Sequence, residues 1–318
     1  MEFVVKSGEQ YAEKTPALAQ FFFENEFLGV AFDLIDGKLK GALKRARENN
    51  EFAGKEGEII VLDSLGSMPA AKVFLVGLGK KDCLCRECLR KAFGRLSAYI
   101  PGCGAKELVV GLPVKKGKAD VYGRAAVEAL ELASYEFDKY KNNPVGKNNQ
   151  KKEDKKKLEK VTFFVEKEDE KKVLEGVHTG KIIAEATNFS RIIANEPPNV
   201  ATPEFVANEA KKVCDKLKLK CTVFDKKEIE KRGMHALLAV NGGSAREPRF
   251  VVMEYYGGAG NEKPFAVVGK GITFDSGGIS IKPSDKMEQM KYDMSGGAAV
   301  LGAMRAIASL KLPVHVIG

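Results

Sequence analysis

The first 140 residues alternate short apolar runs with amphipathic stretches. Two of these stretches, Lys38–Asn49 and Arg86–Tyr99, repeat apolar residues every three or four positions, as helices do, and a third, Ala119–Ser134, is rich in Ala, Leu and Glu, which favour helices. The apolar runs have the length of strands, and they span Phe27–Phe32, Glu58–Leu62, Val73–Leu78 and Leu108–Leu112. Strands that alternate with helices predict an α/β domain.

A polar stretch then interrupts this pattern. Residues 141–157 have almost no apolar side chains and include Pro144 and Gly146, which is typical of an exposed loop or a linker. We therefore expect an N-terminal α/β domain over residues 1–140, a lysine-rich loop or linker over 141–160, and a second domain over 161–318.

The second half of the chain again contains both helix-like and strand-like patterns. A strand at Val161–Val165 precedes a long helical pattern over Asp169–Ala194, which could join two domains. Thr202 can cap a further helix whose first position suits Pro203. The remaining apolar runs predict strands at Lys220–Phe224, Ala236–Val240, Arg249–Tyr255 and Phe265–Val268. The second domain is thus also expected to be α/β.

Composition narrows the protein's class. With 318 residues and 44% hydrophobic side chains, the chain can bury one or two cores. No apolar run approaches the roughly 18 residues that cross a bilayer. The N-terminus also lacks the basic, apolar and small-residue regions that follow one another in a signal peptide. We expect a cytoplasmic protein without a membrane partner.

The six cysteines are expected to be reduced thiols in that compartment. A four-thiolate metal site is the alternative for Cys83, Cys85, Cys88 and Cys103. Their spacing does not form the usual two pairs, and they lie at a predicted helix start, so we favour thiols.

The formal net charge of +9 raises the question of a nucleic-acid partner. Nine lysines fall between Lys139 and Lys160, where they are expected to form a solvated loop. Lysines without interleaved aromatic residues or a recognisable binding module are weak evidence for such a partner.

Candidate chemistry is concentrated in residues 267–293. An apolar run leads into Lys270 and a glycine-rich turn that carries Asp275, and Lys282 follows. Burial would disfavour the charged form of Lys270 and make its amine available as a ligand. Asp293 comes just before a predicted helix whose small first residues, Gly296 to Ala299, allow close approach of a neighbouring strand or metal site. From the residues alone, two internal salt bridges and a metal or phosphate site stay equally open.

Two segments resemble the first metal-ligand segment of the leucyl aminopeptidases, a family of dinuclear metallopeptidases. They are Gly269-Lys-Gly-Ile-Thr-Phe-Asp-Ser-Gly-Gly-Ile-Ser-Ile-Lys-Pro283 and Met290-Lys-Tyr-Asp-Met-Ser-Gly-Gly-Ala-Ala-Val300. Supporting matches lie at Ser134–Tyr140, Asn195–Pro203 and Leu237–Ser244. The resemblance is weak before residue 130 and strong after 190, and it implies a catalytic domain with a mixed central sheet.

The resemblance implies a role for each of these residues. Lys270 and Asp293 would bind one metal ion, and Asp275 would bridge two, either manganese or zinc. Lys282 would stabilise the oxyanion, and Met290 would line the pocket for the N-terminal side chain, with core packing as its alternative role. The implied substrates are peptides with a free N-terminus, preferentially apolar, and the implied assembly is a homo-hexamer.

The sequence also departs from the family pattern. The family's second acidic segment, Asn-Thr-Asp-Ala-Glu-Gly-Arg, is absent, so the chain is expected to be C-terminally truncated and inactive by itself. A degenerate family member that acts as a scaffold or binds nucleic acid is the competing hypothesis. A serine-hydrolase site at Ser276 is rejected, because the similar loop of chymotrypsin-like proteases lies in an all-β fold and this segment lies in an α/β context. A nucleotide-binding site at Gly269-Lys-Gly is also rejected, because the spacing is neither that of a phosphate loop nor that of a dinucleotide-binding motif.

Overall fold

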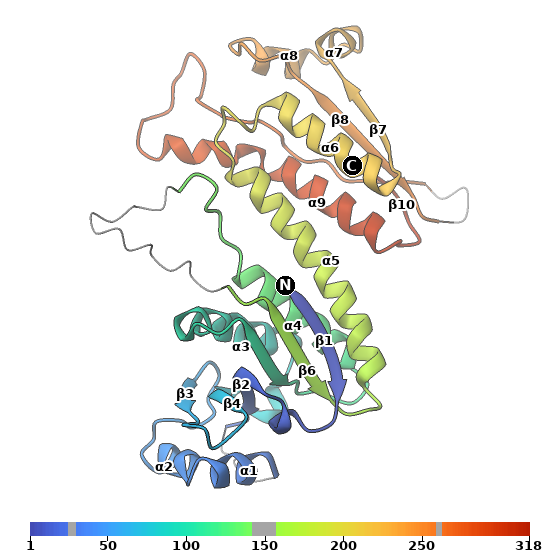
Figure 1. Cartoon of the computed structure of the whole chain (residues 1–318). Helices are drawn as coiled ribbons and strands as arrows, with labels where there is room; N and C mark the ends of the chain where they lie inside the picture. Colours follow the sequence, from blue (N-terminus) through green and yellow to red (C-terminus); the bar gives the residue numbers. More distant parts are fainter. Residues whose placement is uncertain (25–29, 142–156, 259–262) are drawn as a thin grey trace. The chain divides into compact units, whose positions relative to one another are not determined.

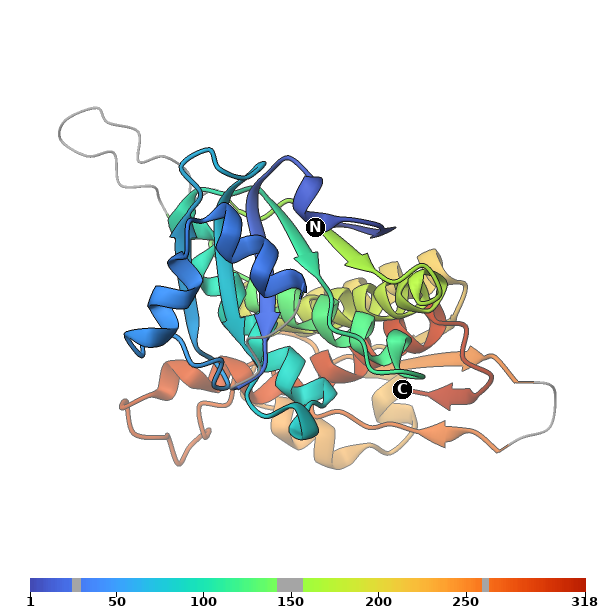
Figure 2. The same cartoon turned by 90° about the horizontal axis from the view of Figure 1, so that it is seen from below.

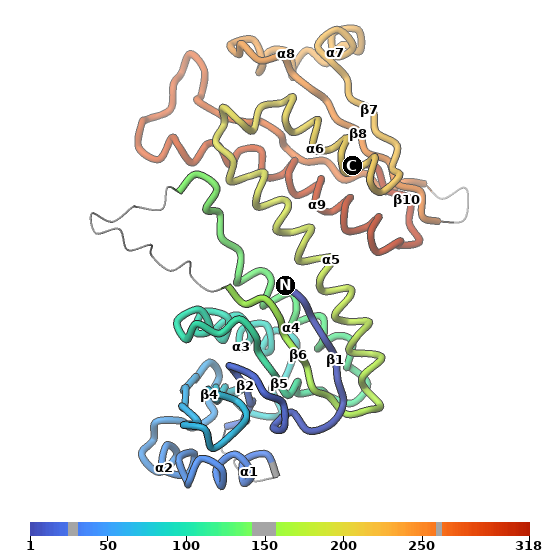
Figure 3. The backbone as a smooth tube through the Cα atoms, in the orientation of Figure 1, coloured from blue at the N-terminus to red at the C-terminus, as the bar shows by residue number. Residues whose placement is uncertain are grey.

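The computed structural model describes residues 1–24, 30–141, 157–258 and 263–318 (Figure 1). Their contacts divide the chain into two units, Met1–Ala184 and Glu185–Gly318. Figure 3 traces the backbone through both. Within the described ranges, no helix combines the length and the apolar character that a membrane span requires.

The first unit is built on a six-stranded sheet. Its neighbouring strands are parallel except for the last pair, which is antiparallel. The order across the sheet is β1 (Glu2–Ser7), β6 (Lys160–Val165), β5 (Glu107–Gly111), β2 (Thr15–Phe22), β4 (Ala70–Gly77) and β3 (Ile59–Asp63). The α/β class predicted from the sequence is confirmed.

Helices cover both faces of this sheet (Figure 2). One layer holds α3 (Arg86–Tyr99), α4 (Ala119–Ala133) and the start of α5 (Glu170–Asn195). The other holds α1 (Val30–Lys38) and α2 (Ala42–Glu48). Successive side chains of a strand point to opposite faces, so Phe21 of β2 packs in the first layer and Phe22 in the second.

One strand prediction for this region needs correction. The strand expected at Phe27–Phe32 is not formed, because residues 30–32 begin α1, while residues 25–29 lie outside the described part of the chain. The boundary between the two units lies at Ala184, inside α5, whereas the lysine-rich loop or linker expected over 141–160 falls largely on residues 142–156, which lie outside the described part of the chain. β6 belongs to the first unit, because it pairs with both β1 and β5, which makes it an interior strand of the first sheet.

The second unit has a four-stranded mixed sheet. In order across the sheet its strands are β7 (Lys220–Phe224), β8 (Phe250–Tyr256), β10 (His315–Ile317) and β9 (Phe265–Ala266). Only the β10–β9 pair is parallel. The core between this sheet and the helices α6 (Pro203–Leu217) and α9 (Ser295–Ser309) includes Met253 and Met304.

Local signals explain most helices of this unit. The Thr202 side chain accepts a hydrogen bond from the Phe205 backbone N–H at 3.3 Å, which confirms the predicted cap of α6. Asp225 caps the short helix α7 (Lys226–Lys231) in the same way. The strand predicted at Ala236–Val240 is wrong, since α8 (His235–Asn241) occupies it. Its alanines and leucines are strong helix formers, and their propensity outweighs the short apolar run.

Candidate functional site

The predicted ligands lie on a long loop and on the turn that follows it. Beyond Ala266 the chain forms no further strand or helix until the 3-10 segment η4 (Met287–Met294). Lys270, Asp275 and Lys282 lie on the loop, and Asp293 lies near the end of η4, just before α9. The Gly297 backbone N–H donates to the Lys270 carbonyl at 2.7 Å, which fixes the loop against the start of α9.

Glycines make this approach possible. A Cβ atom on Gly269 would lie 2.3 Å from the Gly296 carbonyl oxygen, and one on Gly296 would lie 2.9 Å from the Lys270 nitrogen. Neither contact is tolerable between backbone atoms. The prediction that the small residues of α9 admit a close neighbour is confirmed, and the neighbour is the backbone at Gly269 and Lys270.

A second turn brings Lys282 back toward Asp275. Gly277 has a φ of +90°, a conformation that favours glycine, and its N–H donates to Asp275 Oδ1 at 2.9 Å. The Lys282 N–H donates to the Ser276 carbonyl at 2.9 Å, which closes the turn. The side chains that are seven positions apart in sequence therefore become neighbours.

The four charged side chains form two ion pairs. Lys270 Nζ lies 3.2 Å from Asp293 Oδ1, and Lys282 Nζ lies 3.0 Å from Asp275 Oδ2. The hydrogen bond from Lys282, helped by the Gly277 N–H and the charge of Lys270, lowers the pKa of Asp275. The structure thus joins the four residues that the sequence singled out in two pairs, and it forms the two salt bridges that were one of the open alternatives.

The expectation that Lys270 lies at a buried strand end is wrong. Its side chain is 58% exposed, because β9 ends at Ala266 and the loop runs along the surface. Burial therefore does not explain how this amine could act as a neutral ligand. The only charged partner within ion-pair distance among the described residues is Asp293, whose carboxylate is mostly buried.

Met290 lies beside Lys282. The Lys282 ammonium donates to the Met290 sulfur at 3.3 Å, and the methionine is half-buried and absent from the apolar core of this unit. This position does not support the core-packing alternative for Met290.

One oxygen at this site has no protein partner. Asp293 Oδ2 is buried and accepts no hydrogen bond in the described structure, whereas Oδ1 pairs with Lys270. An unsatisfied buried carboxylate oxygen costs stability unless a cation or another donor contacts it. Among the described residues, however, no three His, Cys, Asp or Glu side chains are grouped so that they could hold a metal ion. The described donors are thus two carboxylates and one lysine amine.

Further contacts hold η4 in place, and sequence reasoning missed them. Lys291 Nζ donates to the Asn195 carbonyl at 3.2 Å, and the Tyr292 hydroxyl donates to Asn195 Oδ1 at 3.0 Å. Asn195 is the last residue of α5 and begins one of the segments that carry the family resemblance. Only that resemblance, and no periodicity, could have indicated its role.

The four-thiolate alternative is not formed, since the described residues include no such cysteine group that could hold a metal ion. None of the six cysteines is bridged by a disulfide in the structure.

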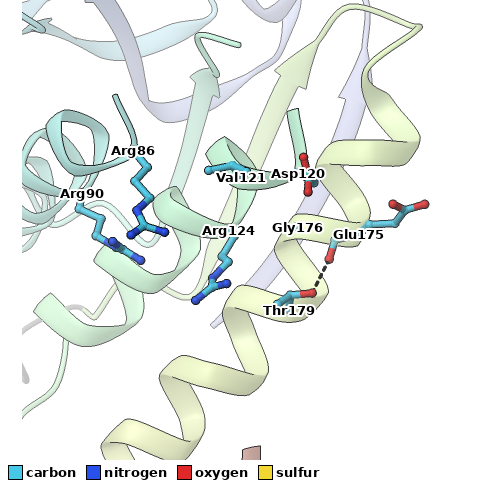
Figure 4. Close-up of a pocket in the computed structure, with 8 residues that line it drawn as sticks. All are labelled: Arg86, Arg90, Asp120, Val121, Arg124, Glu175, Gly176 and Thr179. Carbon is cyan, nitrogen blue, oxygen red and sulfur yellow. Dashed lines mark hydrogen bonds between the residues drawn. The ribbon is translucent and has the colours of Figure 1, made fainter. Parts of the chain in front are cut away.

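A separate cavity of about 240 Å³ belongs to the first unit and contains none of the predicted site residues. Figure 4 shows Arg86, Arg90 and Arg124 extending toward one another from α3 and α4. Arg90 and Arg124 both pair with the buried Glu128 carboxylate, which holds their guanidinium groups in place. The cavity is therefore explained as part of a structural ion-pair network.

Family models match both units. The model described as the N-terminal domain of the cytosol aminopeptidase family matches residues 20–144, and the model of its catalytic domain matches residues 188–318. The gap between the two matches contains the unit boundary at Ala184.

Individual proteins agree with these matches. A probable cytosol aminopeptidase of Nitrosococcus oceani is 38% identical over 100% of the chain and 63% of its own length. One from Aquifex aeolicus is 41% identical over 96% of the chain and 59% of its own length. The chain therefore spans about 60% of the length of these relatives.

Solved structures show the same fold. The bottromycin maturation enzyme BotP in complex with Mn is 28% identical, with a TM-score of 0.75 over 96% of this chain and 58% of its own. A mutant of tomato leucine aminopeptidase superposes with a TM-score of 0.82 at 24% identity, over 100% of this chain and 61% of its own. With both domain models matched in order along the sequence, the chain belongs to the cytosol aminopeptidase family.

Proposed function

We propose that residues 270–293 are the first metal-ligand segment of a metal-dependent aminopeptidase. The observation that carries the proposal is the buried, unpartnered Oδ2 of Asp293, which lies in a segment with the Lys270 amine and the Asp275 carboxylate. Because the chain spans about 60% of its relatives' length, the proposed activity is that of the full-length gene product.

Lys270, Asp275 and Asp293 are the proposed ligands. A nitrogen with carboxylate oxygens suits manganese or zinc, and the Mn complex of BotP favours manganese as the first ion to test. Two divalent ions, when bound, would polarise the peptide carbonyl and acidify a water molecule. The described residues supply too few donors for two complete coordination shells, so other parts of the gene product would contribute the rest.

Lys282 is the proposed oxyanion-stabilising residue. Its ammonium has three donors, of which one is directed to Asp275 and one to the sulfur of Met290. The third is available to a substrate oxygen, where a fixed positive charge stabilises developing negative charge.

Met290 would then contact the N-terminal side chain of the peptide. Its flexible thioether accommodates apolar groups of different shapes, which fits a preference for leucine and similar residues. The expected substrates are peptides with a free N-terminus and an apolar first residue.

Metal binding by the 318-residue chain tests the ligand assignment. Calorimetric titration with Mn²⁺ should detect binding that Asp293→Asn weakens by roughly tenfold or more. The matched control is Asp285→Asn, which changes an exposed carboxylate of the same loop and should leave the affinity unchanged. Equal loss in both variants, or an affinity that Asp293→Asn leaves unchanged, would refute the assignment, and the same titration of the full-length gene product applies if the 318-residue chain alone binds too weakly to measure.

Hydrolysis of leucine amide by the full-length gene product tests the activity. Lys282→Ala should lower kcat by about a hundredfold or more, as loss of an oxyanion-stabilising group does, without lowering Mn²⁺ affinity. A parent enzyme that binds Mn²⁺ and hydrolyses no aminoacyl amide would contradict the proposed function.

A further inference from the structure

Two thiols touch at the start of α3. Cys85 is the N-cap residue of this helix, with extended backbone angles, and Cys88 lies in the first turn. Their sulfur atoms are 3.1 Å apart, and the Cys88 backbone N–H donates to the Cys85 sulfur at 3.4 Å. A disulfide requires a sulfur–sulfur bond of about 2.05 Å, so closure needs a movement of about 1 Å.

The position of this Cys-Arg-Glu-Cys motif in the fold has chemical meaning. α3 connects β4 to β5, and both of these strands run parallel to β2 between them. The motif therefore lies where a parallel strand passes into the N-terminus of a helix. Backbone N–H groups at this end of a helix favour negative charge, and Cys-X-X-Cys motifs placed there are typical of redox-active thiols.

The two sulfurs differ in their surroundings as an attacking and a resolving thiol do. Cys85 is exposed, and hydrogen bonds from the Cys88 thiol and the Cys88 N–H lower its pKa. Cys88 is half-buried, and burial together with its hydrogen bond to Cys85 raises its pKa. A thiolate forms more readily at the accessible sulfur, where an external partner can reach it.

The other cysteines provide internal comparisons. Cys83 is exposed, but its contact with the pair is through its backbone carbonyl oxygen, which lies 3.3 Å from the Cys88 sulfur and competes with Cys85 for the single thiol proton. Cys214 is buried in the second unit, and burial raises its pKa to about 12. Neither combines access to solvent with hydrogen bonds that favour its thiolate.

We propose that Cys85 and Cys88 form a redox-active dithiol that exchanges with external disulfides. The Cys85 thiolate attacks a disulfide R–S–S–R, forms a mixed disulfide and releases one thiolate, which takes up a proton. Cys88 loses its proton and attacks the Cys85 sulfur, which releases the second thiol. In total two protein thiols are oxidised to one disulfide, and R–S–S–R is reduced to two R–SH.

The external disulfide can be a small molecule or a protein, and the chemistry is the same for both. The test equilibrates the 318-residue chain with glutathione buffers of increasing oxidised fraction, or with oxidised thioredoxin. Free thiols are then alkylated at low pH, and the peptide with residues 83–88 is weighed by mass spectrometry. We expect a Cys85–Cys88 disulfide, and the ratio of disulfide to dithiol should rise in proportion to the concentration of oxidised glutathione divided by the square of that of reduced glutathione, as a two-electron exchange requires.

The glutathione and thioredoxin experiments also distinguish a small-molecule disulfide from a protein disulfide. Oxidation by glutathione assigns a small-molecule disulfide, and oxidation by thioredoxin alone assigns a protein partner. If both cysteines remain thiols in both arms, or if the disulfide forms through Cys83, the proposal is overturned.

Variants test the two roles. Cys88→Ser should accumulate glutathione on Cys85 as a stable mixed disulfide, and Cys85→Ser should slow adduct formation at Cys88 by about tenfold or more. Cys83→Ser is the matched control and should leave disulfide formation unchanged. In the unmodified chain, iodoacetamide near neutral pH should react with Cys85 faster than with Cys83, and equal rates would contradict the assignment without relying on a variant's folding.

Discussion

The two sheets differ in how completely their residues are covered. In the first unit, helices pack on both faces, and central strand residues such as Leu18 and Phe74 have no exposed surface. In the second unit, Phe265 of β9 is 68% exposed, and Val268 and Ile281 on the following loop are 94% and 70% exposed. Burial therefore stabilises the first sheet, whereas the segment with the candidate ligands is held mainly by backbone hydrogen bonds and ion pairs.

The largest expected effect is in the covered sheet. Phe74→Ala removes a fully buried ring and should lower the free energy of unfolding by about 3–5 kcal/mol. Ile281→Ala, on the exposed loop, should change it by less than about 0.5 kcal/mol. Urea unfolding followed by circular dichroism measures both. Similar losses in the two variants would show that the contrast between the sheets has no energetic counterpart.

A smaller effect is expected where the loop meets α9. Gly269→Ala places a methyl group against the Gly296 carbonyl, which should cost about 1–3 kcal/mol and weaken Mn²⁺ binding, because Lys270 is displaced from α9. Gly271→Ala is the matched control, since a Cβ there meets no atom within 4 Å. If Gly271→Ala perturbs binding as strongly, close packing at Gly269 does not position the ligand.

The smallest effect concerns a charged contact that links strands β7, β8 and β10 of the second sheet. Glu254 of β8 accepts hydrogen bonds from Tyr256, from Lys220 at 3.0 Å and from His315 at 3.3 Å. These bonds, with that of Tyr256 foremost, lower the pKa of Glu254 to about 2. Because this pKa lies below the usual value of about 4.3, the carboxylate stabilises the fold above that value, and the stabilisation is lost as the pH falls toward 2.

Glu254→Gln should therefore reduce stability by about 1 kcal/mol near neutral pH. The difference from the parent chain should shrink as the pH falls from about 5 to about 2. Unfolding curves across this pH range measure it, and Glu230→Gln, at an exposed position of α7, is the control. A difference that does not change with pH would contradict the assignment of the depressed pKa.

Local patterns in the sequence predicted the long helices and missed two strands. The spacing of apolar residues placed α3 at its observed bounds and α5 within one residue, and a composition rich in Ala, Leu and Glu placed α4 within one residue. It missed β2, because Pro16 and Gln20 interrupt its apolar residues. It also missed β1, whose partner β6 lies more than 150 residues away.

The candidate site was predictable in its residue types and not in its geometry. The sequence placed Lys270, Asp275, Lys282 and Asp293 in one segment, and the family resemblance gave them roles. The two ion pairs depend on a positive φ at Gly277 and on the backbone contact at Gly297, which spacing does not reveal. Likewise, the contact between the Cys85 and Cys88 sulfurs follows from where α3 begins.

The parallel pairing of β1 with β6 has a consequence for synthesis. β1 is made well before its partner, since its register partners are residues 160–165. At about 5–20 residues per second, roughly 10–30 seconds pass between the two. During that interval the apolar side chains of β1 have no strand to pair with, so the first sheet cannot be completed until the chain has passed residue 165. Slow translation would therefore prolong the aggregation-prone stage of this protein.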